Sequence, residues 1–304
     1  MALQTPMVSV NRPLTRSRRR RFVALPYWLL LPALILLLTI FIYPFATGFY
    51  YSLTDGTMLV PGSFVGLRNY LALFSTPDFR QALVFSAEFA FFGVAGSYLI
   101  GLGLAILLNK DMPARGFFRV ALLVPWIIPS IVSMVSWRWL IADETGLVNI
   151  ILSQFGIRPI YFLSSAPLAI ASVIVVKIWR SFPFMMLSIL AALQTIDRDL
   201  YEAAQIDGAG RWQGFRYVTL PHLMNISIVL WILMTIWSVN DFETPYLLTG
   251  GGPSFSTENL IVLAYRLTFR RDDVGSGAAI AFFTLVILMI LALLLLRRQQ
   301  EEEV

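Results

Sequence analysis

Six stretches of predominantly apolar residues follow one another along the chain, separated by charged and turn-forming residues. A bilayer core about 30 Å thick requires about 20 such residues per spanning helix, so each stretch predicts one transmembrane helix. The predicted spans are residues 22–45, 81–108, 117–140, 166–193, 221–239 and 275–296. The pattern therefore predicts an all-α, multi-pass protein of the cell (inner) membrane with six transmembrane helices.

The first stretch follows a run of arginines and could be mistaken for a secretory signal. Its length of about 20 residues and the lack of a small-x-small cleavage site favour a retained membrane anchor.

Lysine and arginine fall unevenly on the two sides of these spans, and cytoplasmic loops retain an excess of them. With the N-terminus inside, the cytoplasmic side holds Arg12, Arg16, Arg18, Arg19, Arg20, Arg21, Lys110, Arg115, Arg119, Arg198, Arg211, Arg216, Arg297 and Arg298. The other side holds half as many: Arg68, Arg80, Arg138, Arg158, Arg266, Arg270 and Arg271. Both termini are therefore expected in the cytoplasm. Residues 1–21 form a basic cytoplasmic segment, 22–296 the six-helix membrane domain, and 297–304 a cytoplasmic tail.

Composition narrows the class further. Of 304 residues, 58% are apolar and 13% are charged. The pI near 9.6 follows from the loop arginines. These arginines can contact anionic lipid, and no nucleic acid is needed to explain them. There is no cysteine and His222 is the only histidine, which excludes disulfides and thiolate or histidine-based metal sites within this chain. No metal site is expected.

The loop 199–221 is the most informative segment, and the charge distribution places it in the cytoplasm. Asp199 can cap a helix whose third residue is Glu202, and Gly208 suits the positive φ at the end of that helix, so a short helix over 200–207 is predicted. A second short helix over 211–218 precedes Pro221, which fits the first turn of the fifth span.

One face of the first short helix suits a protein partner. Ala203 and Ala204 keep that face small, so that another backbone can approach, and Glu202 offers a charge to an arginine of the partner.

Two motifs resemble a known family. Glu202-Ala203-Ala204, then Asp207-Gly208 and Val218-Thr219-Leu220-Pro221, resemble the EAA signature of ABC importer permeases, with valine in place of the commoner isoleucine. The resemblance implies that this loop is a coupling helix, which docks on a cytoplasmic ABC ATPase and passes nucleotide-driven closure to the membrane helices. Residues 246–253, Tyr-Leu-Leu-Thr-Gly-Gly-Gly-Pro, resemble an outer loop of maltose-type carbohydrate importer permeases.

Within that group, the chain resembles the subunit that pairs with a second, non-identical permease. The resemblance also implies an extracytoplasmic solute-binding protein. No Gly-x-x-x-x-Gly-Lys-Ser/Thr loop occurs, so the chain is expected to be no enzyme and to hold no cofactor, with ATP and Mg bound by the ATPase.

The fifth span carries polar and large residues at helical spacing. Ser227, Trp231, Met234, Ser238 and Asp241 recur every three or four residues and share one face. Trp237 adds a ring on which a sugar can stack, while Ser238 and Asp241 supply hydroxyl partners. Helix packing is the competing interpretation, and Trp231 is assigned to packing.

The fourth span carries two cations among polar and aromatic residues: Lys177, Arg180, Ser181, Phe184 and Ser188 form a common stripe. Intramembrane cations need partners, and the nearest expected anions are Glu88 and Asp241. Structural ion pairs are the favoured interpretation. Unpaired cations facing the path would instead suit a glycerophosphate-type or other anionic solute.

Two other classes of function fit the sequence less well. A membrane-embedded enzyme needs converging acid, base, nucleophile or metal groups, and the sequence offers none. A channel or secondary transporter often has matching inverted halves with broken helices, and no such pairing is seen here. The sequence therefore favours a permease subunit that imports a sugar or sugar-like solute, along a path that includes Ser181, Phe184, Met234, Trp237, Ser238 and Asp241.

Overall fold

The computed structural model describes residues 25–60 and 62–302. The predicted basic segment 1–21 lies outside the described residues. The chain divides into two units, residues 1–47 and 48–304, and each is described by itself. The first unit contains α1 (Leu25–Leu37), the π-helix η1 (Leu38–Ile42) and the beginning of α2 (Tyr43–Ser52), with exposed apolar side chains from Trp28 to Ile42.

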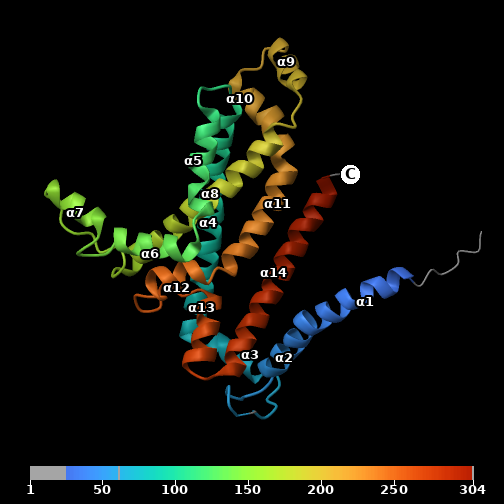
Figure 1. Ribbon diagram of the computed structural model, residues 1–304, viewed down its shortest axis with the longest axis vertical. Coiled ribbons are helices and arrows are strands. Elements are labelled where there is room, and N and C mark those ends of the chain that lie inside the picture. The colour runs from blue at the N-terminus through green and yellow to red at the C-terminus, as the bar shows by residue number, and fades with distance from the viewer. Residues whose placement is uncertain (1–24, 61, 303–304) are drawn as a thin grey trace, which may run out of the picture. The chain divides into compact units, whose positions relative to one another are not determined.

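The second unit is helical. Its elements are α3 (Arg68–Ser75), α4 (Pro77–Asn109), α5 (Arg115–Ile127), α6 (Ser130–Leu140), α7 (Leu147–Gln154), α8 (Ala166–Leu193), α9 (Arg198–Ile206), α10 (Arg211–Gly214), η2 (Phe215–Thr219), α11 (Leu220–Val239), α12 (Glu243–Thr249), α13 (Leu260–Tyr265), η3 (Arg266–Arg270) and α14 (Val274–Glu302). The described residues form no strand, only one isolated antiparallel bridge between Thr54 and Phe64. Figure 1 shows α9 at one end of this unit and α3 and α13 at the other.

Among the residues that the structure describes, five helical stretches are long and apolar enough to cross a membrane: Trp28–Ser52, Pro77–Asn109, Ala166–Leu193, Arg211–Val239 and Val274–Leu294. A sixth candidate is the pair α5 and α6, which are bent by 90° relative to each other. The all-α class and the presence of five to six candidate spans are thus confirmed.

The third predicted span, 117–140, is not one straight helix. Ile128, which precedes Pro129, is extended with φ −63° and ψ 131°, and α6 starts anew at Ser130. The proline ring disfavours helical geometry in the residue before it, so the apolar run continues while its direction changes.

The helix that follows α9 also differs from the prediction. A separate short helix was expected over 211–218, but α10, η2 and α11 form one continuous stretch, Arg211–Val239. The π turn lies directly before Pro221, whose ring would clash with the preceding turn of a regular α-helix.

The short helix predicted over 200–207 begins two residues earlier than predicted. Helix α9 spans Arg198–Ile206, and the carboxylate of Asp197, not of Asp199, caps it by accepting the Asp199 backbone N–H at 3.1 Å. Gly208 has φ +85°, as its predicted role at the helix end requires.

The core of the second unit lies between α4, α8 and α11. A buried cluster includes Leu108 of α4, Met185 and Ile189 of α8, and Leu223 and Met234 of α11. Gly101 of α4 allows a close approach: a Cβ there would lie 2.7 Å from Met185 Cβ. Small residues at such crossings let membrane helices pack backbone to backbone.

Candidate functional site

A cavity of about 490 Å³ lies beside the junction of α11 and α12. We call it the tryptophan cavity, and its lining comes from α5, α8, α11, α12 and the link between the last two: Trp126, Lys177, Arg180, Ser181, Phe184, Met234, Trp237, Asn240, Asp241, Phe242 and Glu243. Five of the six predicted path residues are in this lining; Ser238 is not.

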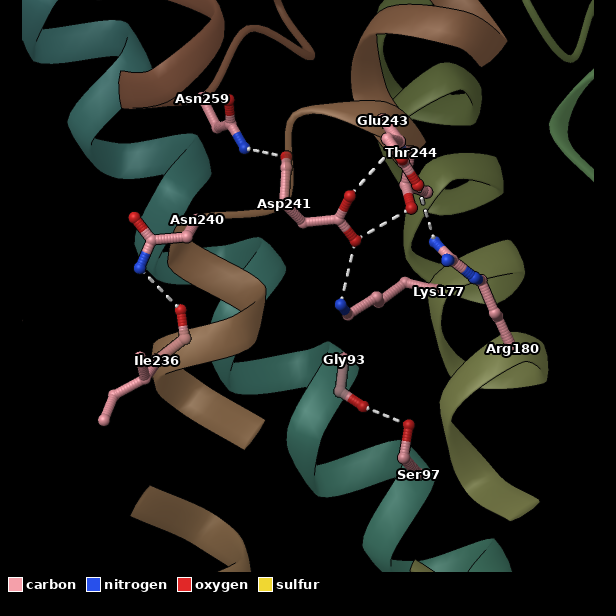
Figure 2. Close-up of polar contacts among 10 residues, drawn as sticks. All are labelled: Gly93, Ser97, Lys177, Arg180, Ile236, Asn240, Asp241, Glu243, Thr244 and Asn259. Carbon is pink, nitrogen blue, oxygen red and sulfur yellow. Dashed lines mark hydrogen bonds and ion pairs between the residues drawn. The ribbon is translucent and has the colours of Figure 1, made fainter. Parts of the chain in front are cut away.

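Asp241 is the polar centre of the cavity wall. Its Oδ2 accepts hydrogen bonds from Lys177 Nζ and Thr244 Oγ1, both at 2.8 Å, and its Oδ1 accepts the Thr244 N–H at 2.9 Å. Asn259 Nδ2 donates to the Asp241 backbone oxygen at 2.7 Å (Figure 2). This residue therefore joins α8, the first turn of α12 and the segment before α13.

The Lys177 side chain is held on several sides. The Lys177 and Asp241 side chains are each 7% exposed. Lys177 Nζ also lies 5.6 Å from the centroid of the Phe89 ring, a cation–π contact. A Cβ on Gly93 would lie 3.1 Å from Lys177 Cγ, so the absence of a side chain at Gly93 makes room for the lysine stem.

The second cation, Arg180, does not pair as predicted. Its guanidinium lies 3.5 Å from Glu243 Oε2, with side-chain exposures of 27% and 47%. Glu88, one of the two predicted partners, forms no ion pair with any described residue, and Asp241, the other, is bound to Lys177. Glu243 lies four residues after the fifth span, in a helix that the hydrophobic pattern did not reveal.

Aromatic rings form the other side of the cavity. The ring centroids of Trp126 and Phe184 are 5.8 Å apart, and those of Phe184 and Trp237 are 5.1 Å apart. The two tryptophans are 47% and 43% exposed. Partly open indole rings next to hydrogen-bonding groups suit a ligand with both apolar and polar faces.

The remaining polar residues of the fifth span are helix contacts. Ser238 is fully buried, and its Oγ has no hydrogen-bond partner among the described residues. Ser227 Oγ lies 2.7 Å from the Tyr98 hydroxyl, and Trp231 packs on Tyr98 with a centroid separation of 5.9 Å. The assignment of Trp231 to packing agrees with this placement.

Sequence reasoning missed Trp126, Asn240, Phe242, Glu243 and Thr244. Trp126 lies at the end of α5, where the unpredicted bend brings it to the cavity. A signal for α12 was present, because aspartate is favoured just before a helix, where its carboxylate can accept a free backbone N–H, as Asp241 does from Thr244.

The coupling candidates lie at the other end of α11. Glu202 and Ala203 are exposed on α9, Ala204 is half-buried, and Asp207 and Gly208 are exposed in the turn after it. Next to them Ile206 is 87% exposed. Pro221, in the first turn of α11, is also exposed. The segment thus presents a short helix on which the apolar side chains of Leu200 and Ile206 are exposed.

The glycine-rich loop after α12 is held by a buried ion-pair network. Arg266 donates to both Glu258 oxygens at 2.7 Å and to Asp78 Oδ2 at 2.8 Å, and its guanidinium lies 4.0 Å from the Phe255 ring centroid. Burial raises the pKa of the Glu258 carboxyl above its usual value, and Arg266 opposes that rise. Gly250 and Gly251 take positive φ angles, which explains the glycine run.

Within the described part of the chain, no three His, Cys, Asp or Glu side chains gather as a metal site would require. The predicted path residues and the predicted ATPase-coupling residues lie at two separate places. One is the tryptophan cavity, and the other is the exposed surface of α9. A single continuous helix, Arg211–Val239, joins them.

This fold, with up to six candidate spans and a cavity beside one of them, defines a multi-pass membrane transport subunit. The chain belongs to the family of binding-protein-dependent transport system inner membrane components, whose family model matches residues 97–301. It is an inner-membrane permease, and its relatives are named as transport permeases and not as enzymes.

Two relatives illustrate the range of the family. The chain is 37% identical over 276 residues to the trehalose/maltose transport system permease protein MalF of Thermococcus litoralis, covering 90% of this chain and 93% of that protein. It is 39% identical over 258 residues to the sulfoquinovosyl glycerol transport system permease protein SmoG of Agrobacterium fabrum, covering 83% of each.

A solved structure shares the fold. A chain of a bacterial ABC transporter involved in the import of the acidic polysaccharide alginate matches with a TM-score of 0.81 at 24% sequence identity, covering 91% of this chain and 95% of that one.

Proposed function

We propose that this chain is the permease subunit of an ATP-driven ABC importer and passes a sugar or sugar-like solute from an external binding protein to the cytoplasm. The observation that carries the proposal is the helix Arg211–Val239, which has the exposed EAA segment before one end and the tryptophan cavity at the other. A cytoplasmic ABC ATPase would bind ATP and Mg and dock on α9. A second, non-identical permease would complete the path.

The distribution of lysine and arginine among the loops supports a topology with both termini and α9 in the cytoplasm. The membrane domain comprises residues 22–296, and residues 297–304 are its cytoplasmic tail. Since the chain has no cysteine, single introduced cysteines can test this. Glu144→Cys, exposed in the loop after α6, should react with an impermeant maleimide in intact cells, and Gln205→Cys on α9 only after permeabilisation. The opposite result would reverse the topology.

Sugars are supported as the solute class by two features. The relatives at 37% and 39% identity are named for trehalose/maltose and for sulfoquinovosyl glycerol. The cavity combines two partly exposed tryptophans with Asn240, Asp241 and Ser181, a set that can stack on a sugar ring and bind its hydroxyls.

A phosphate ester or other anionic solute is the weaker alternative. It requires free cations, but Lys177 is bound to Asp241 and Arg180 lies beside Glu243. An anion would have to displace a carboxylate from its partner, at a cost in binding free energy.

The test is to screen the matching binding protein by thermal shift against sugars, polyols and glycerophosphodiesters, and then to follow uptake of the best ligand into liposomes containing the assembled importer. Uptake of a sugar that needs ATP, the ATPase and the binding protein is expected. Uptake without ATP would indicate a channel or secondary transporter. Stabilisation by glycerophosphodiesters alone would select the anionic class.

A further inference from the structure

Helix α9 is separated from the ends of the spanning helices by open space. A cavity of about 790 Å³ lies between it and the bundle. Its walls include Ile106 and Lys110 at the end of α4, Leu193 at the end of α8, Tyr201 and Gln205 of α9, and Thr219 of η2. A helix with a cavity behind it has few contacts through which to move its neighbours.

One hydrogen bond crosses this space. The Tyr201 hydroxyl lies 2.9 Å from Thr219 Oγ1. Among the described residues, no other side-chain hydrogen bond or ion pair joins α9 to the helix Arg211–Val239. The Tyr201 ring also packs on the buried cluster of α4, α8 and α11, so its hydroxyl is held in position.

Thr219 is suitably placed to receive a displacement. It is 6% exposed and is the last residue of the π turn, where the backbone hydrogen-bond pattern changes before α11 begins. From Thr219, α11 runs without a break to Trp237, about 27 Å away at 1.5 Å per residue. A tilt or rotation at Thr219 therefore moves Met234 and Trp237 in the tryptophan cavity.

We propose that the Tyr201–Thr219 hydroxyl pair is the joint that passes movement of α9 to α11. The inference rests on the proposed function, because it takes an ATPase docked on α9 as the source of movement. Tyr201 and Thr219 are positioning residues: neither lines the tryptophan cavity, and each acts through the helix that does. The nearby π turn gives this junction a different hydrogen-bond register from the rest of the helix.

A reporter at the far end of α11 tests the joint. Asn240 lines the tryptophan cavity and is exposed, and the chain has no cysteine, so Asn240→Cys carries a single environment-sensitive fluorophore within this chain. The assembled importer, with cysteines of the other subunits replaced, is measured before and after trapping ATP, Mg and vanadate. Binding of the ATPase is followed in the same samples.

Three variants isolate the hydroxyl pair. Thr219→Val and Tyr201→Phe each remove one hydroxyl with little change of shape, and both should abolish most of the fluorescence change while the ATPase still binds. Thr219→Ser keeps a hydroxyl and should restore the response, which a purely structural role of the methyl group would not predict. Combining Thr219→Val with Tyr201→Phe should be no worse than either alone, because both remove the same bond.

Thr235→Val is the matched control. It makes the same chemical change in α11, on the face toward α4 and α14, and should leave the response unchanged. A full fluorescence response in both hydroxyl variants would overturn the proposed joint. An equal loss of the fluorescence response in Thr235→Val would also overturn it. Loss of ATPase binding in both hydroxyl variants would also overturn it, by making the bond a folding contact of the loop. A reference importer with no nucleotide-dependent response would overturn the proposed function and the joint with it.

Discussion

Lys177 of α8 donates a 2.8 Å hydrogen bond to Asp241, which lies just beyond the end of α11, and both side chains are 7% exposed. Two charges this well buried depend on each other, since either one alone would keep its desolvation cost without its partner. The pair also fixes the direction in which the chain leaves α11 and enters α12, because the same carboxylate binds the Thr244 backbone N–H.

Asp241→Asn should therefore lower the free energy of unfolding of the subunit. It leaves Lys177 buried without a counter-ion, with an expected cost of about 3–5 kcal/mol in unfolding free energy. Lys177→Gln combined with Asp241→Asn should recover part of it. The measurement is thermal unfolding of the detergent-solubilised importer. Arg180→Gln is the comparison, and since Arg180 and Glu243 are partly exposed, about 1 kcal/mol or less is expected there. A double mutant no more stable than Asp241→Asn would contradict the dependence.

Trp237→Ala should weaken transport without affecting the binding protein's own affinity. Loss of a stacking ring worth about 0.5–1.5 kcal/mol predicts a rise of about two- to tenfold in the KM for uptake. Basal ATPase activity should be unchanged, because α9 is untouched. Ile236→Ala is the control: Ile236 is the neighbouring residue, and it is outside the cavity lining. Equal losses in the two variants would assign Trp237 to helix packing.

Glu202→Lys should leave the membrane subunit folded but uncouple ATP hydrolysis from transport. Glu202 is exposed on α9, so the reversal of charge affects docking and not the core. The ratio of solute-stimulated to basal ATPase activity measures coupling. Glu144→Lys makes the same change in charge in the loop after α6 and should keep the ratio normal. A normal ratio in Glu202→Lys would rule out this residue as a docking contact.

Gly208→Pro addresses the shape of the same segment. Gly208 has φ +85°, whereas proline is confined to φ near −65°, so the turn after α9 cannot keep its path. A folded subunit with uncoupled ATPase activity is expected. Gly156→Pro, at another positive-φ glycine in the loop after α7, is the control for general strain and should preserve coupling.

Arg266→Leu should lower the temperature at which the loop after α12 unfolds. It leaves Glu258, whose side chain is 2% exposed, without its two hydrogen bonds, and about 3–5 kcal/mol is expected for such a broken buried pair. Limited proteolysis between residues 250 and 259 reports the change. Arg271→Leu is the matched variant, because Arg271 is 53% exposed and 3.7 Å from Asp78, and it should have little effect. Similar proteolysis in both variants would count against the network.

Sequence alone determined the class of this protein, and it singled out residues of the tryptophan cavity and of α9. Apolar run length identified the spans, because a bilayer requires about 20 apolar residues per helix whatever their neighbours. Local chemistry also identified the positive φ of Gly208, and helical periodicity placed Ser181 and Phe184 on one helix and Met234 and Trp237 on another, all four in the tryptophan cavity.

Only the tertiary structure decided how those faces meet. Periodicity gives the direction of a side chain around its own helix but not the distance to another helix. The pattern left Glu88 and Asp241 as candidate partners for both cations, and only the structure assigned Asp241 to Lys177 and Glu243 to Arg180. The burial of Ser238 followed from packing around α11. Pro129 marks the break between α5 and α6, but the helix on which α6 then packs, α12, lies more than a hundred residues away in sequence and was not accessible from the pattern.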